Sequence, residues 1–158
     1  MSQKFTFFWH SNSPFSNWYI SPFVHHGITY NCSEQYMMYQ KAILFKDFEV
    51  AEMILEQTLP KKQKFLGRMV RDYDDSIWMK ECLHTMNLGL KSKFTQNEFC
   101  LKSLLDTGDT IIAEASPYDK IWGIGLDEND WRATDPTKWE GKNLLGIVLM
   151  KVRDELRG

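Results

Sequence analysis

Two side chains suited to acid–base or nucleophilic chemistry stand on one short segment, residues 33–42, which read SEQYMMYQKA. Glu34 offers a carboxylate and Lys41 an amine, and large apolar or aromatic residues dominate the stretch between them. The segment is helical in composition, and seven residues is almost two helical turns, so both side chains point the same way. Their axial separation is roughly 10 Å at 1.5 Å per residue. That is too far for an i,i+4 salt bridge, but it suits two long side chains that reach one ligand.

Each of these two residues also has a purely structural interpretation. Glu34 lies three residues after Asn31, which is the spacing of a relaxed capping box, and Ser33 is a rival N-cap. Lys41 can lay its stem on the surface and keep its ammonium in water. The pattern alone leaves the catalytic and structural interpretations open.

A second group of polar side chains lies in residues 114–125, EASPYDKIWGIG. It holds two carboxylates, Glu114 and Asp119, and a Trp122-Gly123 pair. A strand that ends in Ser-Pro and a turn presents Asp119 at a sheet edge, a common place for active residues. Alternatively, Asp119 bonds the nearby backbone and only shapes the turn.

Two further segments add candidate ligand contacts. In FSNWY, residues 15–19, Asn17 offers an amide and Trp18 a ring that can stack on a flat ligand. In GKNLLGIVLMKVR, residues 141–153, Asn143 stands where a helix N-cap is expected.

Several kinds of site have no signal in the chain. Dinucleotide-binding, P-loop and nucleophile-elbow motifs are absent. His25 and His26 are adjacent and point to opposite faces of a strand, which makes a poor metal site. The cysteines are odd in number and have no metal-ligand spacing, so we expect no metal and interpret them as reduced core thiols: Cys32, Cys82 and Cys100.

Composition indicates an ordinary globular protein. With 158 residues, 43% hydrophobic and 25% charged, we expect one domain over residues 1–158. The formal net charge is −2 without a long basic run, which argues against a sequence-independent grip on a nucleic-acid backbone. The start lacks the apolar run of a signal peptide, and LLGIVLM near the C-terminus is too short to span a bilayer. We expect an intracellular, cytoplasmic protein without a membrane partner, with the nucleus possible in a eukaryote.

The elements that must hold these side chains follow from periodicity and turn residues. The fold class predicted is α+β, a mostly helical domain with a small β-sheet. Residues 123–143 show no clear period, and we expect substrate choice to be set there. Expected strands cover residues 4–9, 23–30 (broken by Gly27) and 110–115; expected helices cover residues 33–42, 48–58, 60–70, 75–95, 97–106 and 142–156.

Taken together, these segments resemble the NADAR (YbiA-like) family. The matching pieces occur in family order and cover nearly the whole chain. Each is weak alone, and the ordered set is specific. They are FSNWY, SEQYMMYQKA, LGR at 66–68, NLGL with KF at 87–94, EASPYDKIWGIG, and GKNLLG with LMKVR.

The resemblance implies a YbiA-like fold and cleavage of N-glycosidic bonds between a ribose and a nitrogenous group. One family branch removes ADP-ribose from guanine bases, which suits a role in DNA repair, and another hydrolyses early riboflavin-pathway intermediates. In the first branch the family lysine, here Lys41, attacks the anomeric carbon and forms a Schiff base. We assign proton transfer to Glu34, with Asp119 as the next candidate.

The same resemblance assigns ligand contacts. Arg68 would hold a diphosphate, and Trp18 and Trp122 would stack on a base. No cofactor, metal or obligate protein partner is implied, and the substrate is an ADP-ribose-bearing nucleotide or ADP-ribosylated DNA. Two alternatives stay open: the riboflavin branch, and a non-catalytic ADP-ribose or NAD binding module. The full set of ligand contacts is Asn17, Trp18, Arg68, Glu114, Trp122, Gly123 and Asn143.

Overall fold

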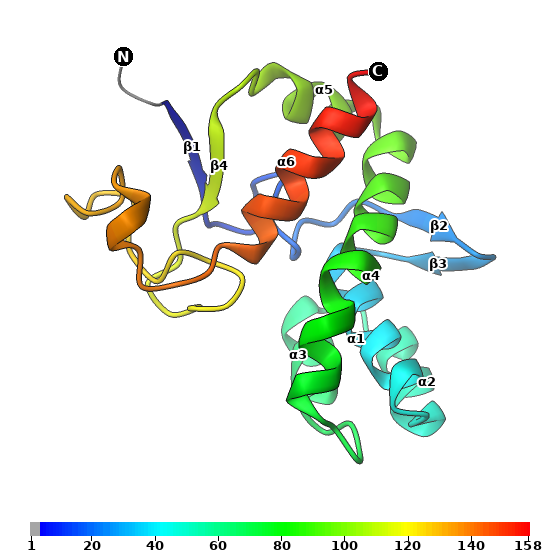
Figure 1. Ribbon diagram of the computed structural model, residues 1–158. Helices are drawn as coiled ribbons and strands as arrows, with labels where there is room; N and C mark the ends of the chain where they lie inside the picture. Colours follow the sequence, from blue (N-terminus) through cyan, green and yellow to red (C-terminus); the bar gives the residue numbers. More distant parts are fainter. Residues whose placement is uncertain (1–3) are drawn as a thin grey trace. The chain divides into compact units, whose positions relative to one another are not determined.

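The computed structural model describes residues 4–158, which form two compact units (Figure 1). The first, the contiguous unit, is Asn17–Asn97. The second, the split unit, combines Glu98–Gly158 with the described residues before Asn17. The α+β, mostly helical prediction is confirmed, whereas the single-domain assignment stays a prediction.

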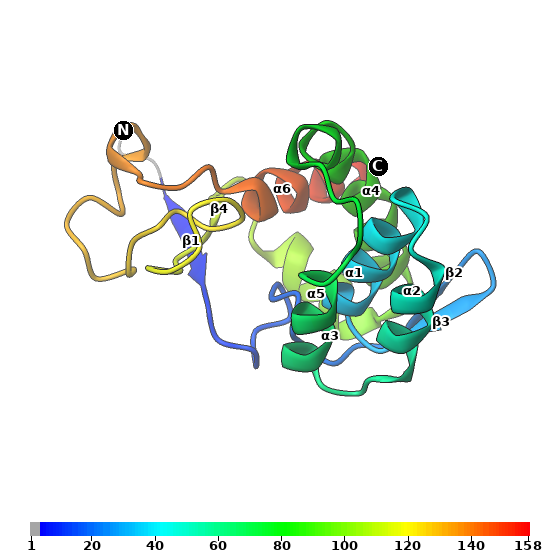
Figure 2. The ribbon, with the colours of Figure 1, turned by 90° about the horizontal axis from the view of Figure 1, so that it is seen from below.

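Helices dominate the contiguous unit. Its α1 packs against α2, α3, α4 and β3, and Figures 1 and 2 show α2 and α3 beside it. Every residue from Ser33 to Met38 is buried, so the first half of α1 is enclosed on all sides. The elements are β2 (Phe23–His25), β3 (Ile28–Tyr30), α1 (Ser33–Leu44), α2 (Phe48–Glu56), α3 (Pro60–Gly67) and α4 (Asp75–Gln96).

Residues 23–30 form a hairpin, which corrects the expectation of one broken strand. Strands β2 and β3 are antiparallel, with Phe23 opposite Tyr30. The turn between them is His26-Gly27, and both residues have positive φ, 50° and 80°. Two-residue hairpin turns of type I′ require positive φ at both positions, and glycine meets that requirement without strain.

The start of α1 differs from the expected capping box. The N-cap residue is Cys32, and no side chain caps the helix, so both Asn31 and Ser33 were wrong as caps. Instead, Gln35 Oε1 accepts a hydrogen bond from the backbone N–H of Asn31 at 2.7 Å. Gln35 Nε2 also donates to the carbonyl of Gln57 at 3.1 Å. One buried glutamine therefore joins the start of α1 to the segment after α2.

The split unit contains a parallel pair of strands. Phe5 lies opposite Ile111 and Phe8 opposite Glu114, so the expected small sheet is two separate two-stranded sheets. A buried cluster packs here from Ala113, Ala115, Ile124, Leu126 and Ala133, with Phe7 and Trp139 against it. The elements are β1 (Phe5–Phe8), α5 (Glu98–Asp106), β4 (Ile111–Glu114), the short 3₁₀ helix η1 (Pro136–Lys138) and α6 (Leu144–Leu156).

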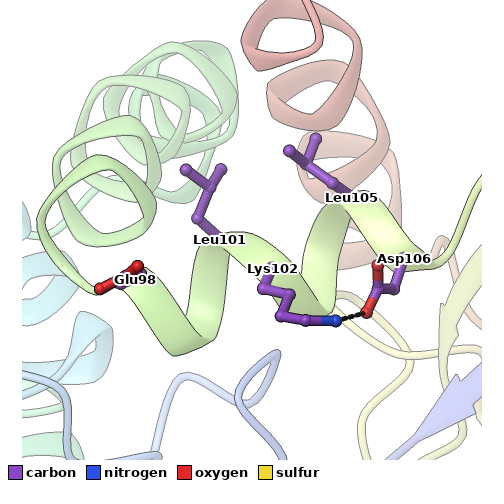
Figure 3. Close-up of a pocket in the computed structure, with 5 residues that line it drawn as sticks. All are labelled: Glu98, Leu101, Lys102, Leu105 and Asp106. Atoms are coloured by element: carbon purple, nitrogen blue, oxygen red, sulfur yellow. Dashed lines mark hydrogen bonds and ion pairs between the residues drawn. The ribbon is translucent and has the colours of Figure 1, made fainter.

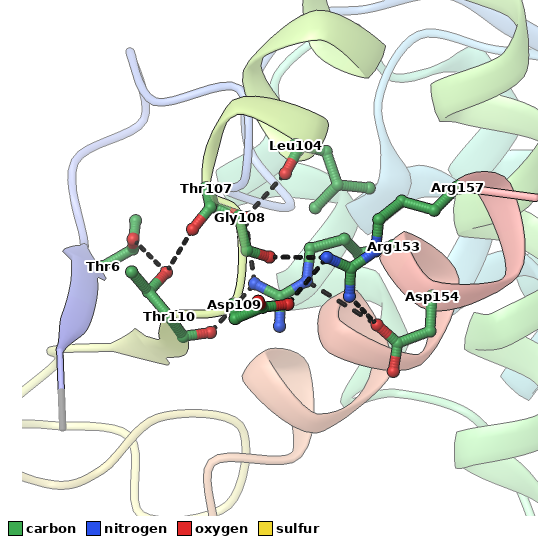
Figure 4. Close-up of polar contacts among 9 residues, drawn as sticks. All are labelled: Thr6, Leu104, Thr107, Gly108, Asp109, Thr110, Arg153, Asp154 and Arg157. Atoms are coloured by element: carbon green, nitrogen blue, oxygen red, sulfur yellow. Dashed lines mark hydrogen bonds and ion pairs between the residues drawn. The ribbon is translucent and has the colours of Figure 1, made fainter.

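Two arginines tie the end of α6 to the turn before β4 (Figure 4). Arg153 Nη1 donates to Thr107 Oγ1 at 3.0 Å and to the Thr110 carbonyl at 2.9 Å. Arg157 Nη1 donates to the Gly108 carbonyl at 3.1 Å. These basic residues thus do more than complement the helix dipole, since they satisfy carbonyls and a hydroxyl of the turn that leads into β4.

The irregular stretch 123–143 is held by its own contacts. Glu140 and Gly141 both donate backbone N–H groups to the Ile124 carbonyl, at 3.0 and 2.7 Å. Trp139 Nε1 donates to the Ala133 carbonyl at 2.8 Å, while Trp131 is 72% exposed. Ordering a segment of this length, in which η1 is a short piece of regular structure, requires such contacts. Its assignment to substrate choice stays a prediction.

The cysteine prediction is confirmed: Cys32, Cys82 and Cys100 are buried thiols, and none of the three forms a disulfide. Burial raises the pKa of the Cys32 thiol to about 11, which keeps it protonated and unreactive near neutral pH. Between residues 4 and 158, no helix combines the length and apolar character that crossing a membrane requires.

Candidate functional site

The amine of Lys41 lies over an aromatic ring. Lys41 Nζ is 4.4 Å from the centroid of the Tyr73 ring, which is cation–π distance. Tyr73 stands in the turn between α3 and α4, and its hydroxyl donates to Asp75 Oδ1 at 2.8 Å. Lys41 itself is half-buried on α1, so water reaches its amine only in part.

The pKa of Lys41 lies below its ordinary value of 10.5. Burial is the main cause because it disfavours the charged form, and the nearby positive charge of Arg68 acts in the same direction. Glu34 and Asp75 oppose this shift with their negative charges. The conflict between burial and Glu34 that the sequence indicated is therefore present, and burial prevails. A lowered pKa raises the neutral, nucleophilic fraction of the amine.

Glu34 is held in place at the first turn of α1. Its side chain is buried, and Trp18 Nε1 donates to Glu34 Oε1 at 3.0 Å. Its backbone N–H donates to the Asn17 carbonyl at 2.9 Å. Asn17 and Trp18 thus meet α1 at Glu34, and the indole N–H of Trp18 orients one carboxylate oxygen.

Some buried polar atoms of the contiguous unit have no hydrogen-bond partner within the described residues, among them Asn17 Oδ1, Ser33 Oγ and Asn87 Nδ2. Buried polar groups are nearly always paired, so such atoms indicate a missing partner. Asn17 and Ser33 both adjoin Glu34 through the backbone, and an amide oxygen and a hydroxyl are suitable acceptors and donors for sugar hydroxyls.

Arg68 is an exposed residue at the C-terminal end of α3. It belongs to the contiguous unit with Glu34 and Lys41. Its guanidinium influences the charge of Lys41, as described above, and remains available to solvent. The predicted diphosphate contact stays a prediction.

Asp119 makes the turn contacts that the sequence left as an alternative. Its Oδ1 accepts backbone N–H groups from Ile121 and Trp122, each at 2.9 Å. Its own N–H donates to Ser116 Oγ at 3.1 Å. One carboxylate oxygen therefore shapes the turn that sets the direction of Trp122.

Gly123 is required by close backbone packing. A Cβ atom there would stand 2.9 Å from the carbonyl oxygens of both Asp119 and Glu114. The Gly123 carbonyl accepts the Asn143 N–H at 3.0 Å. The residue therefore has a structural reason for its type, independent of any ligand.

Asn143 occupies the expected N-cap position of α6 but makes no capping hydrogen bond. Its Oδ1 accepts from the Glu114 N–H at 3.1 Å, and its Nδ2 donates to the Ile112 carbonyl at 2.9 Å. The side chain is buried, and the backbone has a positive φ of 53°. This amide joins β4 to the start of α6, so both of its ends are used within the protein.

Sequence reasoning gave no role to Tyr73 or Lys93. Lys93 is fully buried, with Nζ 5.0 Å from the Phe94 ring centroid and 6.0 Å from that of Tyr19. Lys93 lies in one of the segments that resemble the NADAR family, NLGL with KF, and that resemblance was the signal that could have pointed to it. Tyr73 stands in an irregular turn, and no periodicity marks it.

A surface hollow of about 410 Å³ lies along one face of α5 and holds none of the predicted site residues (Figure 3). Lys102 pairs there with Asp106 at 2.6 Å. All of its lining residues come from one helix face at helical spacing: Glu98, Leu101, Lys102, Leu105 and Asp106. Among residues 4–158, no group of three or more His, Cys, Asp or Glu is placed to hold a metal ion.

Comparison with known proteins yields a family match over most of the chain. The model of the NADAR domain matches residues 7–157. The chain is 48% identical over 126 residues to N-glycosidase R617 of Acanthamoeba polyphaga mimivirus, covering 80% of this chain and 74% of R617. It is 45% identical over 131 residues to Protein irg-1 of Caenorhabditis elegans, covering 82% of this chain. The aligned part is 62% of irg-1, less than two thirds of its length.

A more distant relative carries a different name. Riboflavin biosynthesis protein VVA0006 of Vibrio vulnificus is 30% identical over 142 residues, 90% of this chain and 35% of that protein. Among solved structures, the NMR structure of the Escherichia coli protein YbiA aligns with a TM-score of 0.79 and 27% identity. The alignment covers 99% of this chain and 87% of YbiA, so the YbiA-like fold predicted from the sequence is confirmed.

Proposed function

We propose that this protein, which belongs to the NADAR domain family, is an N-glycosidase that removes ADP-ribose from ADP-ribosylated guanine through a covalent intermediate on Lys41. The observation that carries the proposal is a half-buried amine with a lowered pKa, two helical turns from a buried glutamate. A relative named N-glycosidase, R617, supports the reaction class.

The chemistry begins with the Lys41 lone pair. The neutral amine attacks the anomeric carbon of the ribose, and a new carbon–nitrogen bond forms. The bond from that carbon to the guanine nitrogen breaks, its electron pair goes to the nitrogen, and an acid supplies a proton there. We assign this acid to Glu34, whose Oε1 is held by the Trp18 indole N–H.

Ring opening completes the covalent intermediate. Attack leaves the lysine nitrogen as a secondary ammonium, which first gives up a proton. The nitrogen then shares the freed lone pair with the anomeric carbon, the bond to the ring oxygen breaks, and that oxygen takes a proton. The product is an iminium, the protonated Schiff base. Water then adds to the same carbon, the carbon–lysine bond breaks, and free ADP-ribose and the Lys41 amine are restored. The net reaction consumes one water.

The net charge of the protein is consistent with a substrate that is a single modified base flipped out of its strand. The net charge of −2 provides little backbone affinity. An enzyme that encloses one flipped, modified base needs few contacts to the rest of the strand. In this proposal Asn17 and Ser33 hydrogen-bond the ribose, and Arg68 pairs with the diphosphate.

The test is a trapping experiment. The purified protein is mixed with an oligonucleotide that carries ADP-ribosyl-guanine, a borohydride reductant is added, and the intact protein mass is measured. We expect an adduct of ADP-ribose mass on the wild type and on Lys62→Ala, an exposed lysine of α3, and none on Lys41→Ala.

Other outcomes discriminate between the alternatives. Release of ADP-ribose without an adduct retains the hydrolase and rejects the lysine mechanism. Binding without release or adduct favours a non-catalytic ADP-ribose binding module. Turnover of an early riboflavin-pathway N-glycoside in place of the modified oligonucleotide favours the branch that VVA0006 is named for.

A further inference from the structure

We propose that Tyr73 is a positioning residue for Lys41, and that its ring face stabilises the cationic forms of the Lys41 nitrogen: the ammonium before reaction and the iminium after attack. The second half of this inference rests on the function proposed above. The first half concerns the protein without substrate.

The geometry of the ring carries the argument. Lys41 Nζ lies 4.4 Å from the Tyr73 centroid, where the negative face of the ring attracts a cation. Phe45 packs its ring against Tyr73 at a centroid distance of 5.3 Å and an interplanar angle of 63°. Lys41 lies in the last turn of α1 and Phe45 is the residue that follows the helix, so the C-terminal end of α1 supplies both contacts.

The hydroxyl end of Tyr73 is fixed as well. It donates to Asp75 Oδ1 at 2.8 Å, at the first turn of α4. Burial, followed by this hydrogen bond, raises the pKa of Tyr73 above its ordinary value, so the phenol stays protonated as a donor. The ring is therefore held at both ends, by Phe45 and by Asp75, with its face turned to the amine.

The ring acts within a known balance of charges. Glu34 of the same helix and Asp75 of α4 favour the charged amine, whereas Arg68 at the end of α3 disfavours it. Burial also disfavours the charge and is the largest influence. An aromatic face stabilises a cation without adding a carboxylate. It can therefore hold the amine in one place and still leave its pKa below the ordinary value.

The ability of the Tyr73 ring to stabilise a cation is also useful for the reaction, because the iminium intermediate is a cation. A Schiff base on Lys41 is attacked by water most readily when it is protonated, and the positive charge then lies on the same nitrogen. A group that stabilises that cation assists the covalent step without competing for its proton.

The test reduces the negative electrostatic potential on the face of the Tyr73 ring and keeps the shape of the ring. Tyr73→Phe removes the hydroxyl, and site-specific replacement by mono-, di- and trifluorophenylalanine at position 73 then reduces the cation–π attraction stepwise. The same fluorinated residues at Phe99, an exposed side chain of α5, are the matched control. Trace acetic anhydride labelling over a pH series, quantified on the Lys41 peptide, reports the pKa of the amine without substrate.

We take Tyr73→Phe, which keeps the ring but loses the Asp75 contact, as the reference, and we expect the fluorinated series to lower the pKa of Lys41 from that reference by about half a unit in total. The rate of borohydride-trapped adduct should fall about two- to fivefold along the same series. A purely structural ring would change thermal stability and leave the labelling pKa unmoved, and a flat labelling series would overturn the proposal.

The two proposals fail in different ways. If the wild type forms an adduct while fluorination changes neither labelling nor trapping, Tyr73 is not a positioning residue and the N-glycosidase remains. If labelling responds to fluorination but the wild type never forms an adduct, the ring holds the ammonium and the Schiff-base function is rejected.

Discussion

The contiguous unit and the split unit use the same kinds of residue for different purposes. In the contiguous unit, candidate side chains contact other side chains: Trp18 bonds Glu34, and Lys41 lies over Tyr73. In the split unit, Asp119 and Asn143 bond backbone groups. A carboxylate or amide that hydrogen-bonds backbone groups holds the course of the chain. One that contacts another side chain can still take part in a reaction. This difference favours the contiguous unit as the place of the proposed chemistry.

The largest expected effect compares the two carboxylates directly. Glu34→Gln removes the acid and should lower kcat by roughly 10²–10⁴-fold, the usual range for general acid–base catalysis. Asp119→Asn keeps an oxygen to accept from Ile121 and Trp122, so kcat should fall less than about tenfold, with about 1 kcal/mol lost in stability. Single-turnover rates and urea midpoints of both variants measure this, and a larger kcat loss for Asp119→Asn would reverse the comparison.

A second comparison concerns two glycines, one from each unit. At Gly141 a Cβ would stand 2.2 Å from the Gly123 carbonyl oxygen, which is backbone and cannot move aside. At Gly67 the Cβ would meet the Met38 thioether at 2.0 Å, and a methionine side chain can adopt another rotamer. We expect Gly141→Ala to cost about 3 kcal/mol of unfolding free energy and Gly67→Ala about 1 kcal/mol. Equal losses in urea denaturation would show that Met38 is as confined as the backbone.

The smallest effect tests the charge balance at Lys41. Arg68 lowers the pKa of Lys41, so Arg68→Gln should raise it. The neutral amine is the reacting form, so the rising limb of the pH profile of kcat/KM should move to higher pH by less than about one unit. Lys61→Gln, an exposed residue at the start of α3, serves as the control. A shift to lower pH would contradict the assigned sign.

The predictability of the fold followed the length and regularity of each element. A stripe of apolar residues predicted α6 because its packing face repeats along the helix: Leu144, Leu145, Val148, Leu149, Val152 and Leu156. The first five are buried and Leu156 is half-buried. The cap of α1 was mispredicted because Gln35, a residue inside the helix, accepts a hydrogen bond from the backbone N–H of Asn31. The hairpin at His26-Gly27 was missed because a non-glycine residue takes positive φ there. Such choices depend on contacts that no local pattern encodes.

The candidate site also has a part that could be predicted from the sequence and a part that could not. Glu34 and Lys41 could be proposed because regular helix geometry puts residues seven apart on one face. The burial that lowers the Lys41 pKa arises from the packing of other helices around α1, and the Tyr73 contact arises from an irregular turn. The alternative roles of Asp119 could not be separated from sequence, because a turn contact and a catalytic carboxylate use the same residue type.

The pairing of β1 with β4 has a consequence for the order of folding. Phe5–Phe8 must wait for Ile111–Glu114, about a hundred residues later in the chain, before its backbone finds a partner. During synthesis, the whole of Asn17–Asn97 leaves the ribosome between β1 and β4 and can fold as an uninterrupted segment. In that interval Phe-Thr-Phe-Phe is an unpaired, aromatic-rich strand, which is the kind of segment that needs protection from aggregation.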